Sequence, residues 1–310
     1  MKWYKFLTPL ALLAILSLPS SAANDKNYTY LALGDSVSFG LDIRLVPLLP
    51  PASGTKLPSP AAFIGYPVAV ANALHLSQSK KFVDASCPGQ SSASFLNKLI
   101  PDIGCELFKK YIGLHTTYSG SQAAFAVAQL QTNRNINLVT LNLGGNDLSM
   151  LQASCPLDPN FSDCVTAGLN TLLPAYGANL GQILYSIRVL GGYQGELVLL
   201  TQYSPSADLL FQGAVTAVNT VLKNVAAPFG AKIADGFAAF NLAAVAINGG
   251  TNLDPCQAGL VIRLTSSPLT CDIHPSPLGH DILAATILAA IGDHNNGGEA
   301  NDSHAKSGPR

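Results

Sequence analysis

Two side chains that lie far apart in the sequence could together perform nucleophilic chemistry. Ser36 follows Gly34 and Asp35 directly after a short apolar run, and His274 stands in the stretch CDIHPSPLGHDI near the other end of the chain. A serine hydroxyl becomes a nucleophile when a base such as imidazole lies within hydrogen-bond reach. The reaction also needs a group that orients the base and donors for the oxyanion. These residue types therefore predict acyl transfer, provided that the fold brings Ser36 and His274 together.

Two further groups could donate hydrogen bonds to an oxyanion. Gly89, in the stretch CPGQSS, has no Cβ, so its N–H can approach a ligand closely. Asn146, in the stretch GGND, carries two amide N–H donors on a short side chain. Together with the backbone N–H of Ser36, they would form an oxyanion hole of three donors. We expect Asp35 to anchor the turn before the serine, and Asp147 to support the turn after the third strand or to orient Asn146.

His274 is the expected base both by its placement and by elimination. Ser276 is a good N-cap and Pro277 suits the first helical position, which predicts a final helix over 278–291. His274 would then lie in the turn just before this helix. His280 falls inside the helix and is interpreted as structural, and the other histidines lie in no comparable context.

A second serine offers an alternative nucleophile. The stretch GQSSA, residues 89–93, differs from the Gly-x-Ser-x-Gly turn of α/β-hydrolases only in its last residue. Ser91 would be the nucleophile in that case. This hypothesis leaves the Gly-Asp-Ser and Gly-Gly-Asn-Asp stretches without a function, so Ser36 is favoured.

The elements that must position these groups follow an alternating pattern. Short apolar runs predict strands, and the longer stretches between them predict helices, which is typical of a parallel sheet covered on both faces. The predicted strands are 29–33, 81–85, 137–143, 196–202 and 232–234, and the predicted helices are 64–74, 122–131, 169–190 and 207–226.

The candidate chemistry follows the first three predicted strands. Ligands of an open parallel sheet bind beyond the carboxyl ends of the strands, so we expect Ser36, Gly89 and Asn146 to share one rim. The segment 45–60 contains five prolines and must be a loop. It is a candidate wall of the substrate pocket, with a plain connector as the alternative.

Composition and charge limit the class of protein. Charged residues make up only 11% of the chain and the net charge is −1, with no basic patch, which argues against nucleic-acid binding. Residues 1–23 combine a positive start, an apolar run and small residues, which predicts a secretory signal peptide. The run is shorter than the ~20 residues that span a bilayer, so an uncleaved anchor is only the alternative. We expect one hydrolase domain over 24–293, a disordered tail over 294–310, and a secreted monomer that is extracellular or periplasmic and not inserted in a membrane.

Six cysteines follow the predicted signal peptide. An even number in a secreted chain indicates three disulfides, although six cysteines allow fifteen connectivities. Sequential pairing is favoured because each bridge then closes one local loop. The predicted pairs are Cys87 with Cys105, Cys155 with Cys164, and Cys256 with Cys271.

Four of these stretches resemble, in order, the blocks of the SGNH or GDSL hydrolases. They are GDSVSFG from Gly34, the Gly89 stretch, GGND, and DIHP from Asp272. The resemblance implies a flavodoxin-like three-layer α/β/α sandwich with a five-stranded parallel sheet. It implies Ser36 as nucleophile, Gly89 and Asn146 as oxyanion donors, and His274 as general base. It further implies hydrolysis of a small-molecule or lipid ester without metal or cofactor. The cysteine loops are similar to those of secreted bacterial members of the family.

The sequence departs from the family at the catalytic acid. The family's acid usually stands three residues before the histidine, a position that Cys271 occupies here, and Asp272 stands two residues before. In an extended segment, residues i and i+2 face the same side, so Asp272 could still reach the imidazole. The alternative is that a backbone carbonyl orients His274.

Three functions are consistent with these residues. A secreted serine esterase or lipase is favoured because the stretch after Ser36 is apolar and rich in proline. A carbohydrate O-acetylesterase is the second hypothesis. A domain that binds glycans or lipids without hydrolysing them is the third, although binding alone requires no nucleophile and base.

Overall fold

The computed structural model describes residues 29–77 and 80–292. The predicted signal peptide over 1–23 and the predicted tail over 294–310 lie outside these residues. None of the helices in the described ranges has the length and apolar character needed to cross a bilayer.

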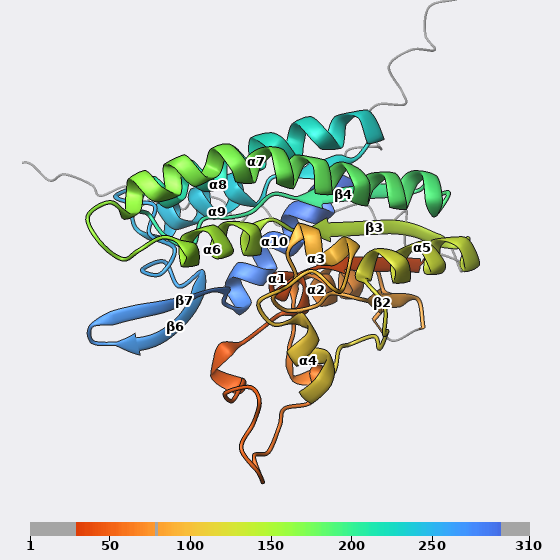
Figure 1. Ribbon diagram of the computed structural model, residues 1–310, viewed down its shortest axis with the longest axis horizontal. Coiled ribbons are helices and arrows are strands. Elements are labelled where there is room, and N and C mark those ends of the chain that lie inside the picture. Colours follow the sequence, from red (N-terminus) through yellow and green to blue (C-terminus); the bar gives the residue numbers. More distant parts are fainter. Residues whose placement is uncertain (1–28, 78–79, 293–310) are drawn as a thin grey trace, which may run out of the picture.

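A parallel sheet of five strands forms the centre of the molecule (Figure 1). The strands are β1 (Thr29–Gly34), β2 (Phe82–Asp84), β3 (Ile136–Asn142), β4 (Glu196–Leu200) and β5 (Lys232–Ala234). Their order is β2-β1-β3-β4-β5, and each neighbouring pair is parallel. This is the flavodoxin-like order, in which the chain changes direction between β1 and β3 and ligands bind at that point. All five strands predicted from the sequence are confirmed.

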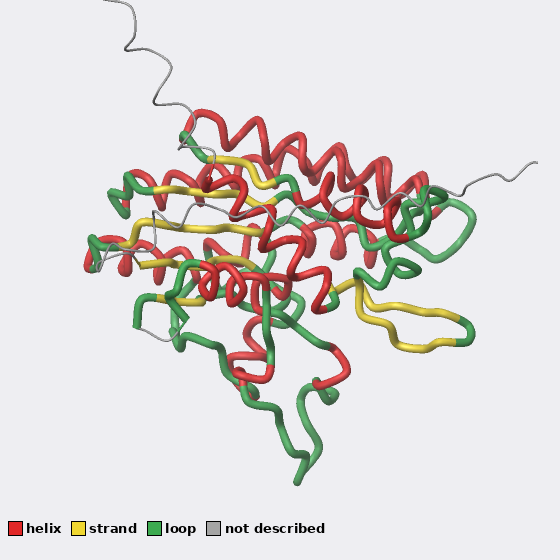
Figure 2. Tube along the Cα trace, turned by 180° about the vertical axis from the view of Figure 1, so that it is seen from behind, coloured by secondary structure: helices red, strands yellow, loops and turns green. Residues whose placement is uncertain are grey.

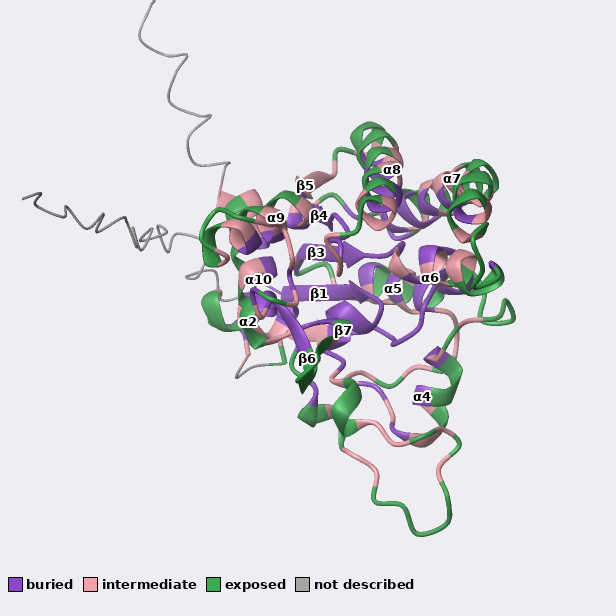
Figure 3. Cartoon of the chain, turned by 90° about the vertical axis from the view of Figure 1, so that its left-hand side faces the viewer, coloured by how far each residue is buried: buried purple, intermediate pink, exposed green. Residues whose placement is uncertain are grey.

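Helices cover both faces of the sheet, as the buried residues of each strand require. Side chains of β1 alternate between the faces: Leu31 and Leu33 belong to one apolar cluster, and Tyr30 and Ala32 to the other. The first cluster includes residues of α5 (Gln122–Thr132), α7 (Phe161–Tyr185) and α8 (Leu209–Ala226), and the second includes residues of α2 (Tyr66–Ala73), α9 (Gly236–Ile247) and α10 (Pro277–Gly292). Figure 3 shows these two helical layers with the purple, buried sheet between them. The predicted three-layer α/β/α sandwich is confirmed.

Shorter elements surround the carboxyl ends of the strands. They are α1 (Ser36–Phe39), α3 (Ser92–Leu96), α4 (Cys105–Tyr111) and α6 (Gly145–Ser154), with single turns at Ile43–Leu45, Pro60–Ala62 and Ala227–Phe229. The predicted helix over 169–190 begins earlier, as α7, and ends in a π-helical turn at Ser186–Leu190. The helices α1, α3 and α6 each begin directly after a sheet strand or the loop that follows it. Ser36 lies on α1 and Asn146 on α6, and Gly89 lies in the loop before α3.

A two-stranded antiparallel hairpin lies outside the main sheet. Its strands are β6 (Val261–Ser266) and β7 (Leu269–Pro275), and Figure 1 shows it in blue, extending from the body. His274 therefore lies near the end of a strand, and not in a turn as the sequence suggested. The reason is that β6 pairs with residues on both sides of His274, Cys271 before it and Pro275 after it, which holds this stretch extended.

The proline-rich segment 45–60 is a projecting loop (Figure 2). Val46 and Leu49 pack against a third apolar cluster, which lies beneath the loops and includes Phe39, whereas Leu48 is 89% exposed. The segment is thus attached to the body through a few side chains.

Candidate active site

Ser36 lies at a sharp turn from strand to helix. Gly34 ends β1 with φ +144°, and a Cβ there would lie 2.5 Å from the carbonyl oxygen of Asn142, so only glycine fits. Asp35 is the N-cap of α1, and its carboxylate accepts a hydrogen bond of 2.9 Å from the N–H of Val37. Asp35 therefore anchors this turn, and Ser36 becomes the first residue of a helix, where its N–H is not used by the helix itself.

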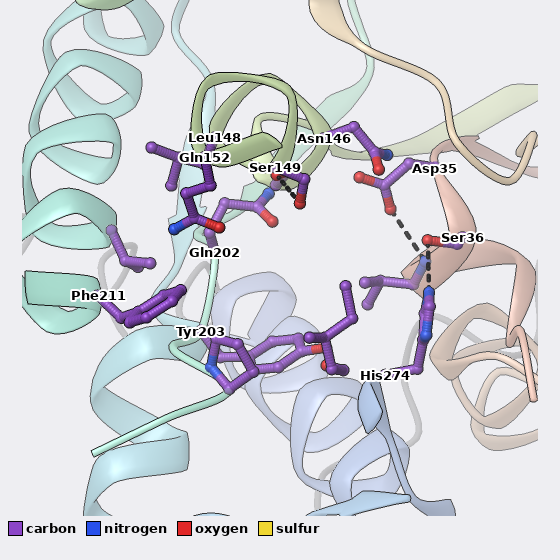
Figure 4. A pocket seen from close by; sticks show the side chains of 15 residues that line it. Asp35, Ser36, Asn146, Leu148, Ser149, Gln152, Gln202, Tyr203, Phe211 and His274 are labelled. Atoms are coloured by element: carbon purple, nitrogen blue, oxygen red, sulfur yellow. Dashed lines mark hydrogen bonds between the residues drawn. The ribbon is translucent and has the colours of Figure 1, made fainter. Parts of the chain in front are cut away.

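The fold brings Ser36 and His274 into contact across 238 residues of sequence. The Oγ of Ser36 lies 2.9 Å from the Nε2 of His274 (Figure 4). The Nδ1 of His274 lies 2.6 Å from the carboxylate of Asp272. A carboxylate only accepts, so Nδ1 donates to Asp272 and the neutral ring leaves Nε2 to accept from the serine hydroxyl. The three side chains form a continuous hydrogen-bonded relay.

The acid of this relay remains ionised. Burial opposes the charge of Asp272, but the hydrogen bond from His274 and the attraction to that ring outweigh it, so the pKa of Asp272 is lowered. Two other carboxylates lie near His274 and bond elsewhere: Asp35 to Val37, and Asp42 to Arg44. Asp272, and not a backbone carbonyl, is the group that contacts Nδ1.

The predicted oxyanion donors meet beside the serine turn. Gly89 has φ +82°, and a Cβ there would overlap the backbone nitrogen of Gly104. The Nδ2 of Asn146 donates a 2.9 Å hydrogen bond to the carbonyl of Gln90, next to Gly89. This bond fixes the amide and leaves its second N–H without a partner in the described part of the chain. The N–H of Gly89 likewise donates to no other described group.

Two buried carboxyl groups support these loops. Burial raises the pKa of Asp35 to about 7, against the hydrogen bond from Val37 and the attraction of His274. Burial also raises the pKa of Asp147, although hydrogen bonds from Ser92 counteract it. Asp147 accepts from the N–H and hydroxyl of Ser92 at 3.0 and 2.6 Å. It therefore links α6 to α3. The alternative prediction that Asp147 orients Asn146 is not borne out, because no hydrogen bond joins the two side chains in the described part of the chain.

The alternative nucleophile has no base. Ser91 is the N-cap of α3, where its side chain accepts from the N–H of Ser94 and also contacts the Ser94 hydroxyl. None of the histidines in the described ranges forms a hydrogen bond with it. The hypothesis of an α/β-hydrolase nucleophile at Ser91 is wrong, because the GQSSA stretch forms a capping box at the start of a helix. His280 is buried inside α10, and this burial lowers its pKa to about 3, which agrees with its structural interpretation.

A cleft opens beside Ser36 and His274 (Figure 4). It encloses about 640 Å³ of empty space, including the open solvent at its mouth. The residues that line it come from the serine turn, α6, the loop after β4, α8 and β7: Asp35, Ser36, Val37, Gly145, Asn146, Leu148, Ser149, Gln152, Gln202, Tyr203, Pro205, Phe211, Val215, Ile273 and His274. None belongs to the segment 45–60, so the prediction that this segment walls the pocket is wrong. Its residues Val46 and Leu49 pack instead against the apolar cluster that includes Phe39 of α1.

Comparisons with solved structures identify the fold. The phospholipase A1 from Streptomyces albidoflavus NA297 matches 84% of this chain and 98% of its own, with a TM-score of 0.53 and 19% identity. A GDSL-like lipase from Parabacteroides merdae matches 86% and 96%, with a TM-score of 0.50 and 13% identity. An acetylxylan esterase variant from Geobacillus stearothermophilus matches 85% and 94%, with a TM-score of 0.49 and 18% identity. No protein-family model and no curated protein matches the sequence.

This chain has the SGNH/GDSL hydrolase fold. The resemblance seen in the four sequence blocks is confirmed at the level of the fold.

Within this SGNH/GDSL fold, the acid occupies a displaced position. Cys271, three residues before His274, forms a disulfide with Cys256. The acid at position 272 reaches the ring because β7 is extended there. The pairs Cys87–Cys105 and Cys155–Cys164 are also bridged, so the sequential pairing is confirmed.

Two residues that support the candidate site were not predicted. Gln122, fully buried on α5, accepts from the N–H of Gly34 at 2.6 Å and donates to the carbonyl of Gly34 at 2.9 Å and to the Oε1 of Gln90 at 3.0 Å. It therefore clamps the serine turn to the Gly89 loop. The hydroxyl of Tyr203 donates a 2.6 Å bond to the carbonyl of Ile273, between the acid and the base. Nothing in the sequence distinguishes Gln122 from Gln129 and Gln131 of the same helix, and nothing in it shows the partners of Gln122.

Proposed function

We propose that the chain is a secreted serine esterase or lipase that hydrolyses carboxylic esters through an acyl-enzyme on Ser36. One observation carries the proposal: the hydroxyl of Ser36, the ring of His274 and the carboxylate of Asp272 form a relay with contacts of 2.9 and 2.6 Å at the edge of a cleft. The three disulfides support a location outside the reducing cytosol.

Acylation begins with transfer of the serine proton. The Nε2 of His274 accepts the proton of Ser36 as the oxygen attacks the ester carbonyl, and the adjacent Asp272 stabilises the imidazolium. The carbonyl oxygen becomes an oxyanion, which the N–H groups of Ser36 and Gly89 and the Asn146 amide can receive. The imidazolium then protonates the leaving alcohol as the carbon–oxygen bond breaks.

Deacylation repeats these transfers with water. His274 takes a proton from the water, whose oxygen attacks the acyl-enzyme, and the same donors receive the second oxyanion. The ring then returns the proton to Ser36 as the acid leaves. Every proton in this cycle is carried by the serine, the histidine, the water or the alcohol, so no step requires a metal or cofactor.

Apolar side chains of the cleft support a substrate with an acyl chain. Leu148 of α6, Ile273 of β7, and Phe211 and Val215 of α8 all line the cleft, and Figure 4 shows Leu148 and Phe211 among its lining side chains. The sequence favoured fatty esters because of the proline-rich segment, which does not line the cleft. The apolar side chains that do line it are now the reason to favour these substrates. Removal of acetyl groups from carbohydrate remains the second candidate, because Ser149 and Gln152 line the cleft as neutral polar groups.

A panel of p-nitrophenyl esters, from acetyl to palmitoyl, tests the proposal together with acetylated xylan. The chain from residue 24 to 310 should hydrolyse the activated esters with a burst of nitrophenol, and the Ser36→Ala variant should show neither burst nor turnover. The Ser91→Ala variant is the matched control and should keep the burst. Release of acetate from xylan alone would favour the second candidate, and binding without any turnover by the wild-type chain would favour the non-catalytic hypothesis.

A further inference from the structure

One polar side chain in the cleft has no partner and no place in the mechanism above. Gln202 follows β4 and is 4% exposed, and its Nε2 is buried without a hydrogen-bond partner among the described residues. Leaving a buried donor without a partner is unfavourable, so such a group in a native fold calls for an explanation.

Two hydrogen bonds hold the backbone of Gln202 in place, so the fold itself determines where its side chain lies. Its N–H donates to the Oδ1 of Asn219 at 2.8 Å, and its carbonyl accepts from the Nδ2 of the same residue at 2.8 Å. Asn219 belongs to α8 and is itself buried. The loop after β4 is therefore fixed where it meets the cleft.

The carboxamide of Gln202 lies in the same cleft as the reacting groups. A Cβ on Gly145 would lie 3.0 Å from the Oε1 of Gln202 and 4.0 Å from the Oδ2 of Asp35, so both side chains lie next to Gly145. Figure 4 shows Gln202 on the same side of the cleft as Ser149, across from Ser36 and His274. A substrate whose ester carbonyl contacts Ser36 would thus extend past Asn146 toward Gln202.

The surroundings of Gln202 favour a neutral ligand group. No lysine or arginine is among the residues that line the cleft. An anionic group would meet no cation there and would approach the carboxyl groups of Asp35 and Asp147. A carboxamide offers one donor and one acceptor, and rotation by half a turn exchanges their positions. A hydroxyl group, which also donates and accepts, matches it.

We propose that Gln202 is a specificity-determining residue that hydrogen-bonds a hydroxyl group on the substrate, so that the enzyme prefers esters of polyols or hydroxy acids to plain alkyl esters. This proposal rests on the ester hydrolysis proposed above and names its substrate class. The hydroxyl would lie on the part of the ester that enters the cleft beyond Asn146.

Two matched pairs of esters test this specificity, one with the hydroxyl on the alcohol part of the ester and one with the hydroxyl on the acyl part. The first pair is 1-monobutyrin and propyl butanoate, and the second is p-nitrophenyl 3-hydroxybutanoate and p-nitrophenyl butanoate. In one of the pairs, the wild-type kcat/KM should favour the hydroxyl-bearing ester by roughly 3- to 10-fold, which corresponds to one net hydrogen bond. The Gln202→Met variant, of similar length, should lose this preference, so that the ratio of the two kcat/KM values within the pair falls to about one.

The controls separate a specificity role from a structural one. Gln131→Met changes an exposed glutamine of α5 far from the cleft and should change nothing. Equal kcat/KM within both pairs for the wild type, or a preference that survives Gln202→Met, would overturn the proposal and would mean that Nε2 binds only water.

Loss of ester hydrolysis altogether is a separate result. If the wild type hydrolyses neither ester of a pair, the proposed function fails. The same pairs are then compared by calorimetric binding to the Ser36→Ala variant, with and without Gln202→Met. Tighter binding of the hydroxyl-bearing ester that depends on Gln202 would still support the subsite, and equal binding would refute it.

Discussion

Asp272 accepts a 2.6 Å hydrogen bond from the Nδ1 of His274, two residues further along the same strand. Alternate side chains of a strand face the same side, so β7 presents the acid and the base together. The neighbouring Cys271 is bridged to Cys256, and the carbonyl of Ile273 accepts from Tyr203. Asp272 stands only two residues before His274, yet it completes the relay because the disulfide at Cys271 and the hydrogen bond from Tyr203 hold this part of the strand in place.

Replacement of this acid should remove most of the activity. In the Asp272→Asn variant, an amide donor can face Nδ1, which favours the ring tautomer that cannot accept the serine proton. We expect kcat for p-nitrophenyl acetate to fall by about 10³–10⁴-fold with little change in stability. Asp42→Asn, which changes a carboxylate near the ring that bonds only Arg44, is the control and should remain active. Comparable losses of kcat in both variants would show that Asp272 is not the specific residue that orients His274.

Removal of the Asn146 amide should slow the chemical step. Asn146→Ala deletes a proposed oxyanion donor and should lower kcat by about 10²–10³-fold while KM changes little. The variant also loses the bond to the Gln90 carbonyl. Asn179→Ala deletes an amide that bonds Ser92 in the same region but does not line the cleft, so it controls for packing. A normal kcat in Asn146→Ala would exclude the side chain from the oxyanion hole.

The Gln122 clamp should contribute to stability. Gln122→Leu leaves the buried N–H and carbonyl of Gly34 without their partner, and each unpaired group costs about 1–3 kcal/mol. The urea midpoint should therefore decrease strongly, and kcat should decrease because the serine turn and the Gly89 loop lose their connection. Gln131→Leu, on the same helix and exposed, should have little effect. Equal midpoints for the two variants would argue against the clamp.

The buried carboxyl of Asp35 should make stability depend on pH. Its pKa rises from 3.8 to about 7 on folding, so between these values the folded chain holds a proton that the unfolded chain has released. Rising pH therefore favours unfolding in this window. Asp35→Asn keeps a capping oxygen and cannot titrate.

Urea unfolding at a series of pH values measures this effect. The stability of Asp35→Asn relative to the wild type should increase from about pH 4 to about pH 7 and then level off. Asp208→Asn, at the exposed N-cap of α8, is measured in parallel to correct for the change of capping group. A difference between Asp35→Asn and wild type that is constant over this range would contradict the raised pKa.

The sheet and the relay could be predicted because their signals are local. Buried parallel strands are continuous apolar runs, and Ser36, Gly89 and Asn146 each follow one of them, so the topology alone places them on one rim. The contact of His274 with Ser36 followed from the placement of the histidine before the last helix. The sequential disulfides followed from the short loops that they close.

Features that depend on distant partners could not be predicted. Strand β6 is weakly apolar at its exposed end, and only its pairing with β7 reveals the hairpin. Gln122 bonds Gly34 across 88 residues, and Gln202 enters the cleft because Asn219 fixes its backbone. The position of the cleft wall also depends on how α6 and α8 pack, which is why the segment next to Ser36 in sequence was wrongly assigned to it.

Labelling with a fluorophosphonate, followed by peptide mapping, tests the central claim most directly. The reagent forms a stable adduct only with a serine that an adjacent base activates. The account predicts one adduct, on Ser36, that forms in the wild type and is lost in the His274→Ala variant. An adduct on Ser91, or equal labelling of Ser36 with and without His274, would contradict it.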